Sequence, residues 1–231
     1  MNMKKNCSTL LIFALLAGGG CASTEHTNTP DSAPAQAEPA PQDHVSAASE
    51  VPPTKYRKGD YVRYEYRGSA LAHPVILDER ILSQEGNQLE IHVRATKKDD
   101  VRQWVQVVTD TPHNQANNVI DGLFEIVNGE RVRLENIDNR DIYRLYEWTF
   151  PPSFQPEGKP ESITRSVDID GSQQDAQCTT MKGKSATNTV VALFCKSSAF
   201  LWTNVYGQVI SDPDGEVLWE MVVLKAGRDT P

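Results

Sequence analysis

The sequence predicts a mainly β domain, a curved antiparallel sheet of about ten strands packed on one helix. Three observations lead to this fold class. Short segments alternate between apolar and polar residues, turn residues recur between them, and one stretch has helical spacing. A two-sheet β-sandwich is the alternative, because it is built from strands with the same pattern.

The first alternating segment is 60–67, in which Val62, Tyr64 and Tyr66 share one face. Further strands are expected at 75–84, 89–96, 101–109, 120–127, 131–134, 163–169, 190–195, 200–211 (broken at Gly207) and 216–225. Asn128-Gly129 is a strong hairpin turn signal. The segment 216–225 is apolar on both faces, which predicts a strand buried on both sides.

One helix is expected before Pro151 and Pro152, which would end it. Asp138 or Asp141 can cap its first turn. Apolar residues with helical spacing follow the cap: Ile142, Leu145 and Tyr146. This helix is expected to cover the strand 216–225. Residues 150–160 are expected to form a Pro-rich loop.

The N-terminal segment has the three marks of a secretion signal. Lys4 and Lys5 are positively charged, residues 10–17 are apolar, and small residues 18–20 precede Cys21. The apolar run is too short to cross a bilayer as a helix, which needs about 18 residues or more. It is therefore expected to be removed rather than to span a membrane.

The small residues followed by Cys21 resemble the lipobox of bacterial lipoproteins, although Gly18 stands where the family usually has Leu. The resemblance implies cleavage by signal peptidase II and acyl chains, such as palmitate, on Cys21. Ala22, rather than Asp, then implies the outer membrane, on either its periplasmic or its surface face. Ordinary cleavage after Ala22 is the alternative.

The chain divides into a signal peptide at 1–20, a lipidated Cys and tether at 21–53, and one globular domain at 54–231. The tether has no aromatic residue after Cys21, two large aliphatic residues and six prolines, a composition typical of disorder. Without residues 1–20 the chain has 21 Lys and Arg against 31 Asp and Glu, a net charge of −10. This charge disfavours nucleic acid and anionic lipid as partners.

Cys178 and Cys195 are the two cysteines that remain beside Cys21 after the signal is removed. An even pair in a chain sent to an oxidising compartment predicts a disulfide. A metal pair and a redox couple are the alternatives. The hairpin between the two cysteines is expected to turn near Ala186 and Thr187.

The domain is expected not to be an enzyme and to need no cofactor. His73, His92 and His113 lie in no nucleophile or metal motif. Asp168, Asp170 and Asp175 offer carboxylates around Gly171, as some Ca²⁺ loops do, but they lack the full twelve-residue pattern. A hairpin turn is the favoured interpretation, and no metal site is assigned.

Aromatic residues could line a groove for an apolar ligand, although such residues more often belong to a core. The candidates are Trp148, Phe150, Phe154, Trp202 and Tyr206, with Phe200 nearby. With such a groove the domain would resemble the LolA/LolB lipoprotein carriers, which are lipid-binding half-barrels. The resemblance rests on element order and lipidation and carries over no binding residue.

The first functional hypothesis is therefore an outer-membrane-anchored lipoprotein whose non-catalytic β domain binds an envelope protein or supports an assembly. The second is a carrier of a hydrophobic ligand. The third is an envelope enzyme of unknown reaction.

Overall fold

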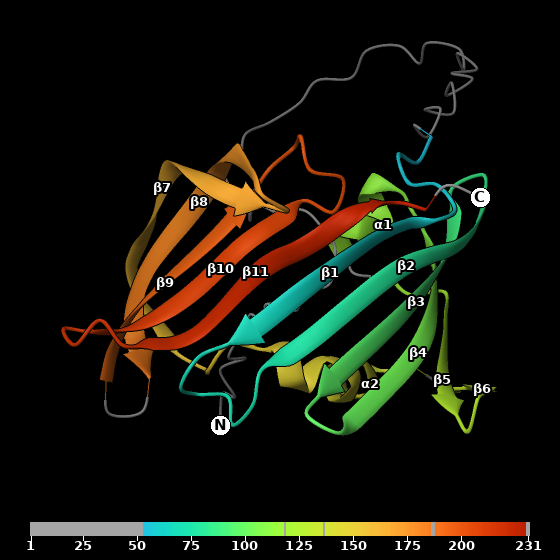
Figure 1. Cartoon of the computed structure of the whole chain (residues 1–231), viewed down its shortest axis with the longest axis horizontal. Helices are drawn as coiled ribbons and strands as arrows, with labels where there is room; N and C mark the ends of the chain where they lie inside the picture. Colours follow the sequence, from blue (N-terminus) through green and yellow to red (C-terminus); the bar gives the residue numbers. More distant parts are fainter. Residues whose placement is uncertain (1–52, 118, 136, 186–187, 230–231) are drawn as a thin grey trace, which may run out of the picture.

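The computed structural model describes residues 53–117, 119–135, 137–185 and 188–229. Cys21 and the signal segment lie outside the described residues, as does nearly all of the tether. The domain is one open sheet of eleven strands, and every neighbouring pair is antiparallel (Figure 1). The mainly β, antiparallel class is confirmed, with a single sheet in place of a sandwich.

The strands are β1 (Asp60–Arg67), β2 (Val75–Glu85), β3 (Gln88–Lys97), β4 (Asp100–Thr109), β5 (Gly122–Val127), β6 (Glu130–Arg133), β7 (Gln155–Ile169), β8 (Ser172–Ser185), β9 (Asn188–Lys196), β10 (Asn204–Asp212) and β11 (Val217–Arg228). The helices are α1 (Pro112–Asn117), α2 (Asn139–Tyr146) and the 3₁₀ turn η1 (Glu147–Thr149).

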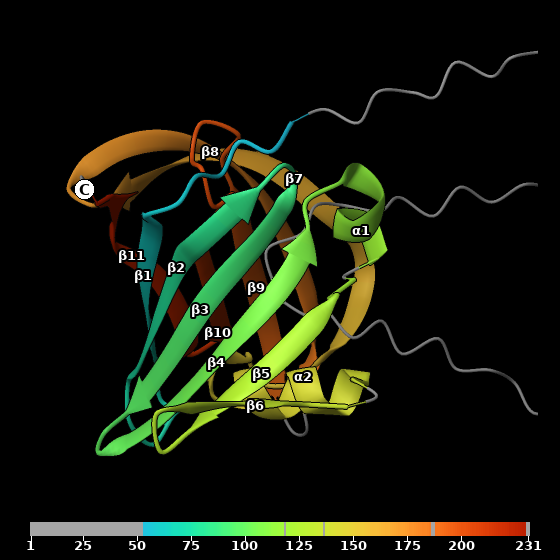
Figure 2. The same cartoon turned by 90° about the vertical axis from the view of Figure 1, so that its right-hand side faces the viewer.

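The sheet order is β6-β5-β4-β3-β2-β1-β11-β10-β9-β8-β7. Consecutive strands pair as hairpins, and the first strand pairs with the last. The connection from β6 to β7 must therefore cross from one edge of the sheet to the other. This connection carries α2 and η1, which is why they lie at one end of the hollow of the sheet (Figure 2).

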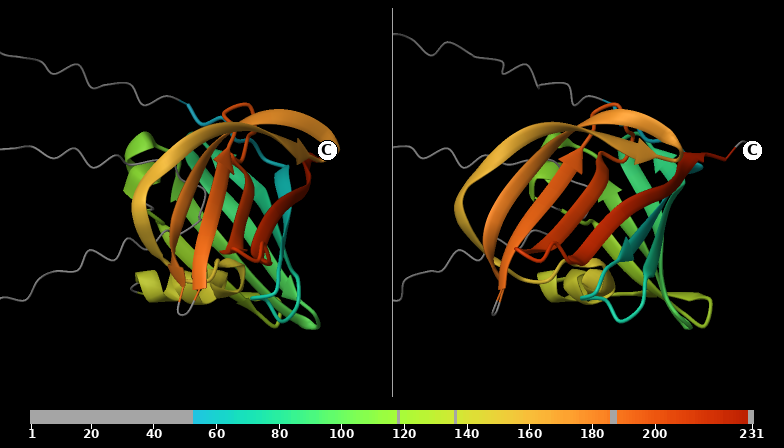
Figure 3. Two further views of the ribbon diagram at one scale, coloured as in Figure 1. Left: turned by 90° about the vertical axis from the view of Figure 1, so that its left-hand side faces the viewer. Right: turned by 60° about the vertical axis from the view of Figure 1, so that its left-hand side comes forward.

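The sheet is strongly curved, and the end of β7 bends over until it touches β11 (Figure 3). Val167 and Ile169 near that end are buried. The apolar residues of alternate positions along each strand fill the concave side as one continuous core. The convex side carries most of the charged residues and faces solvent.

Helix α2 begins as predicted. Asp138 is its N-cap, and its Oδ1 accepts hydrogen bonds from the backbone N–H groups of Arg140 and Asp141 at 2.7 and 3.2 Å. Tyr146 packs edge-on against Trp104 of β4, with ring centroids 4.8 Å apart. Past the helix, the Nε1–H of Trp219 donates to the carbonyl of Thr149 at 3.1 Å.

Two predictions about the C-terminal strands were wrong. Gly207 does not break its strand: a Cβ there would lie 2.8 Å from the ring of Trp219, so glycine makes room for the indole inside β10. Strand β11 is buried on one face only, since Leu224 on its other side is 41% exposed. A central antiparallel strand can leave one face to solvent.

One predicted loop contains secondary structure. Residues 150–160 include the start of β7, where Pro156 and Pro160 are tolerated because an edge strand has one side without pairing partners. His113 lies in the short helix α1, which begins at Pro112. In the ranges that the structure describes, no helix is long and apolar enough to cross a membrane.

The Cys178–Cys195 disulfide is present. Strands β8 and β9 form a hairpin in which these two residues are direct cross-strand partners. The predicted turn at Ala186 and Thr187 lies outside the described residues. The two cysteines are 17 positions apart in the sequence. Their bond links β8, which lies next to the edge strand β7, to β9 nearer the centre of the sheet.

We predict that the double change Cys178→Ala and Cys195→Ala lowers the free energy of unfolding by about 3 kcal/mol, because the unfolded chain gains the entropy of an open loop. Urea unfolding monitored by tryptophan fluorescence measures the change. A reductant should destabilise the natural protein equally and leave the double variant unaffected. Equal stability of the oxidised protein and the variant would contradict this expectation.

Candidate functional site

A groove of about 450 Å³ lies where the curved edge of the sheet meets its centre. It is lined by residues of the β7–β8 turn, of the loop between β9 and β10, and of β1 and β11 where these strands pair. We call it the Trp202 groove. Its apolar lining residues are Ile169, Phe200, Leu201, Trp202 and Ala226. The shape and lining suit an apolar molecule or segment.

Two polar atoms of residues that line this groove have no hydrogen-bond partner within the described chain. They are Nε1 of Trp202, whose residue is 1% exposed, and Oε1 of Gln174. A buried polar atom without a partner costs roughly 1–3 kcal/mol. Two of the residues that line this one groove therefore carry an unpaired donor and an unpaired acceptor.

An ion pair forms the polar rim of the Trp202 groove. Asp60 is buried, and its carboxylate accepts two hydrogen bonds from Arg228, at 2.5 and 3.2 Å. The backbone N–H of Arg57 also donates to it, at 2.7 Å. The hydrogen bond to Asp60 raises the pKa of Arg228. Asp60 is thus fully engaged in structure, while Arg228 brings a positive charge to the rim.

The segment before β1 closes this end of the domain. Tyr56 is buried against Trp202, with ring centroids 5.3 Å apart. Thr54 holds the segment in place, because its N–H donates to Oδ1 of Asn87 at 3.0 Å and its hydroxyl bonds to Asp110. The groove therefore lies at the same end of the domain as the described segment before β1.

A carboxyl group without an ion-pair partner among the described residues is buried in the concave core. Glu79 of β2 is 4% exposed and lies between Val62 and Val93 on the neighbouring strands. No described residue donates a hydrogen bond to it or forms an ion pair with it. Burial raises its pKa to about 8, so the group is mostly neutral at pH 7.

Glu79 influences the tyrosines of the core. Burial raises the pKa of Tyr64, Tyr66 and Tyr146 above the usual value, and the charge of Glu79 adds to each rise. The hydroxyl of Tyr146 is 3.4 Å from Oε1 of Gln106, another buried polar side chain. Polar groups thus gather on the otherwise apolar concave face near α2.

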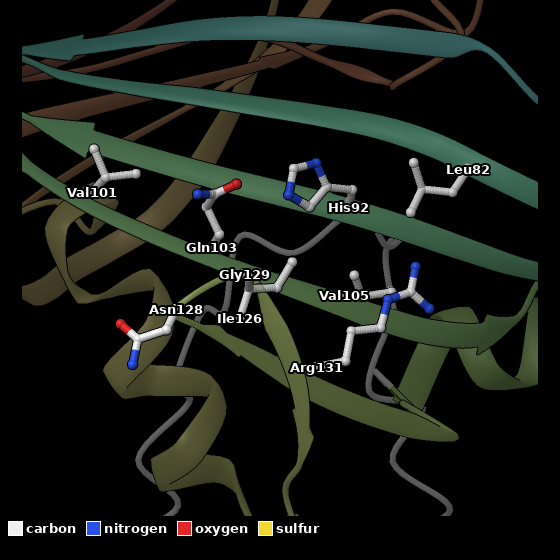
Figure 4. Close-up of a pocket in the computed structure, with 9 residues that line it drawn as sticks. All are labelled: Leu82, His92, Val101, Gln103, Val105, Ile126, Asn128, Gly129 and Arg131. Carbon is white, nitrogen blue, oxygen red and sulfur yellow. The ribbon is translucent and has the colours of Figure 1, made fainter.

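A second hollow, of about 620 Å³, lies on the convex face of β2–β6 (Figure 4). We call it the convex hollow. Its apolar residues are Leu82, Val101, Val105 and Ile126, and its polar side chains include His92, Gln103 and Arg131. Burial lowers the pKa of His92, and a hydrogen bond with Gln103 partly offsets this effect by raising it. Three nearby positive charges lower the pKa further, those of Arg131, Arg80 and Arg94.

The structure does not bring the five predicted aromatic residues into one groove. Trp148 lies in η1 with the guanidinium of Arg102 3.9 Å from its ring centre, and Phe150 stacks on Tyr143 at 4.8 Å. Phe154 lies beside Gly183. Tyr206 is on the convex face of β10 and donates to Glu220 at 2.7 Å. Of the five, Trp202 lines the groove described above.

The acidic candidates lie around the β7–β8 turn. Oδ1 of Asp168 accepts the backbone N–H of Gly171 at 3.0 Å, and its Oδ2 accepts from Gln173 at 3.2 Å. Asp170 adopts a positive φ of 52° in the turn, and Asp175 is exposed on β8. Among the described residues, no group of three or more His, Cys, Asp or Glu side chains could hold a metal ion.

The sequence contained a signal for one of the two sites that were missed. Glu79 interrupts the apolar series Val75, Leu77 and Ile81 on one face of β2, and a charged residue in such a series marks a buried carboxyl. The partnership of Trp202 with Gln174 carries no such signal, because the two residues come from different hairpins.

No protein-family model matches the chain, and no curated protein matches it. Among solved structures, the chain is similar to the hypothetical protein CT021 from Chlamydia trachomatis. The two share 10% identity over 76% of this chain and 89% of that one, with a TM-score of 0.40. A likeness at this level carries no argument about function.

We predict that Glu79→Gln stabilises the domain in alkaline solution. The carboxyl ionises near pH 4.5 in the unfolded chain and near pH 8 in the fold, so the stability of the natural protein falls as pH rises through that window. The variant lacks this loss. The free energy of unfolding of the variant should exceed that of the natural protein by about zero below pH 4.5 and by on the order of 5 kcal/mol above pH 8.

Urea unfolding at several pH values measures this difference, with Glu85→Gln at the exposed end of β2 as the matched control. The control should follow the natural protein at every pH. A constant difference between Glu79→Gln and the natural protein across the range would contradict a buried, ionisable Glu79.

Proposed function

We propose that this protein is a lipid-anchored, non-catalytic binding protein of the bacterial outer membrane, and that its β domain binds a hydrophobic ligand in the Trp202 groove. The observation that carries the proposal is the groove itself. It combines apolar walls with a buried indole N–H and an amide oxygen that have no partners in the described chain.

The ligand in this proposal is mainly apolar and has one polar end. Its apolar part packs on Phe200, Leu201 and Ala226. Its polar end offers an acceptor to Nε1 of Trp202 and a donor to Oε1 of Gln174, as an amide or a hydroxyl group does. These groove atoms hydrogen-bond without moving protons, which supports binding rather than catalysis.

The anchor in this proposal is the lipid on Cys21, expected from the lipobox resemblance. Two or more acyl chains hold a protein stably at a membrane, whereas one is marginal. The tether enters the domain at Thr54, close to the Trp202 groove. Helix α2 covers the other end of the concave face, so the groove would receive its ligand from the tether side.

We predict that Trp202→Phe and Leu201→Glu both reduce ligand binding. The first keeps an aromatic ring but removes the donor, and the second places a charge in the apolar wall. Mass spectrometry of lipid extracts measures how much lipid co-purifies with each protein. The extract of Leu201→Glu should contain no bound lipid, and that of Trp202→Phe should contain less than that of the natural protein. Leu224→Glu, at an exposed residue outside the groove, is the matched control. Extracts free of any bound species for the natural protein would refute the proposal.

We predict that Cys21→Ser releases the protein from membranes. Serine has no thiol for the diacylglyceryl group, so no acyl chain can be attached. Labelled palmitate should be incorporated into the natural protein and absent from the variant, and the variant should leave the membrane pellet. A variant that still sediments with the envelope and partitions into detergent would exclude this anchor.

A further inference from the structure

The convex face contains a cationic cluster that the acidic net charge of the chain conceals. Arg63 of β1, Arg80 of β2, Arg94 of β3 and Lys225 of β11 line one pocket of about 320 Å³. The acidic residues that line the same pocket are Asp78, Asp229 and Glu79, and the side chain of Glu79 is buried in the concave core. The cluster therefore has an excess of positive charge at the centre of the sheet, where the four strands are neighbours.

Two of the four cations have no carboxylate partner among the described residues. Arg63 pairs with Asp78 at 2.6 Å, and Arg80 pairs with Asp229. Arg94 and Lys225 form no ion pair, although Lys225 lies 5.8 Å from the ring centre of Tyr61. The guanidinium of Arg80 lies 5.6 Å from the same ring. Tyr61 thus holds two cations at the pocket, where an anion can reach them.

The cationic pocket adjoins the convex hollow, and His92 lines both. His92 is the cross-strand partner of Arg80 on one side and of Val105 on the other. Moving across the strands from β1 to β5, the cationic pocket gives way to the convex hollow, in which the apolar side chains of Leu82, Val101 and Ile126 lie beside polar ones. Val101 is 43% exposed.

An oxyanion beside an apolar chain is the chemistry that complements such a surface. Phosphate groups are bound by Arg and Lys, with Arg able to bind two oxygens at once. We infer that the convex face binds an anionic phospholipid, with the phosphate among Arg80, Arg94 and Lys225 and part of an acyl chain in the convex hollow. This site is separate from the Trp202 groove.

The test uses the full chain with Cys21→Ser, so that no attached lipid contributes to binding. The protein is sedimented with vesicles of phosphatidylcholine, with and without phosphatidylglycerol. It should bind the anionic vesicles, and added salt should weaken the binding. Equal binding to both kinds of vesicle would overturn the inference.

The double change Arg94→Gln and Lys225→Gln removes the two unpaired cations and should weaken binding to the anionic vesicles roughly tenfold or more. The matched control is Lys159→Gln with Lys196→Gln, which removes the same charge from exposed residues of β7 and β9. If both double variants lost the same amount of vesicle binding, net charge alone would explain the effect, and the proposed site would be wrong.

Two further measurements separate a lipid from a free phosphate ion. Val101→Ser should weaken vesicle binding, because it removes an apolar contact in the convex hollow. Calorimetric titration with inorganic phosphate should give much weaker binding than the vesicles give. Inorganic phosphate that binds as tightly as the vesicles, or Val101→Ser binding unchanged, would overturn the assignment to a lipid.

Discussion

The fold depends on one constraint: a single sheet must bury its own apolar face. No second sheet covers the concave side in the described chain, and the helices are short. The sheet therefore curves until the end of β7 touches β11. Trp219 occupies the space that this curvature creates. Its ring lies against Tyr66 and Phe194, and Gly207 leaves room for it.

Against that apolar interior, the buried polar groups need an explanation. Trp104, Trp202 and Gln174 each keep a polar atom out of solvent without a partner in the described chain, and each such atom lowers stability. Glu79 is buried as well, and burial raises its pKa. Proteins usually satisfy buried polar groups, and the exceptions often lie at functional sites. In this domain they occur at two places, the middle of the concave face and the Trp202 groove.

The two faces of the sheet have different chemistry because alternate residues of every strand point to opposite sides. On β2, Leu77 faces the core while Asp78 and Arg80 face out. Antiparallel pairing then places outward residues of neighbouring strands side by side, which gathers cations from β11, β1, β2 and β3 into one pocket. A net negative charge therefore does not describe each part of the surface.

Local residue patterns were enough to predict most of the strands, several hairpin turns, the cap of α2 and the Cys178–Cys195 bond. Each of these predictions depends on residues that are near one another in the sequence or on the number of cysteines. The hairpin turn at Asn128-Gly129 and the cap at Asp138, for example, are recognised from their immediate neighbours alone. The Pro-rich start of β7 was missed because its status as an edge strand is a property of the whole sheet.

The sequence by itself thus determined that this is a β domain whose strands have one apolar and one polar face. The tertiary structure alone decided that the sheet is single and curved, that Glu79 is buried, and that Trp202 shares a groove with Gln174. The physical reason is distance along the chain. β1 pairs with β11, which is the last strand in the sequence, and no local pattern specifies a partner so remote.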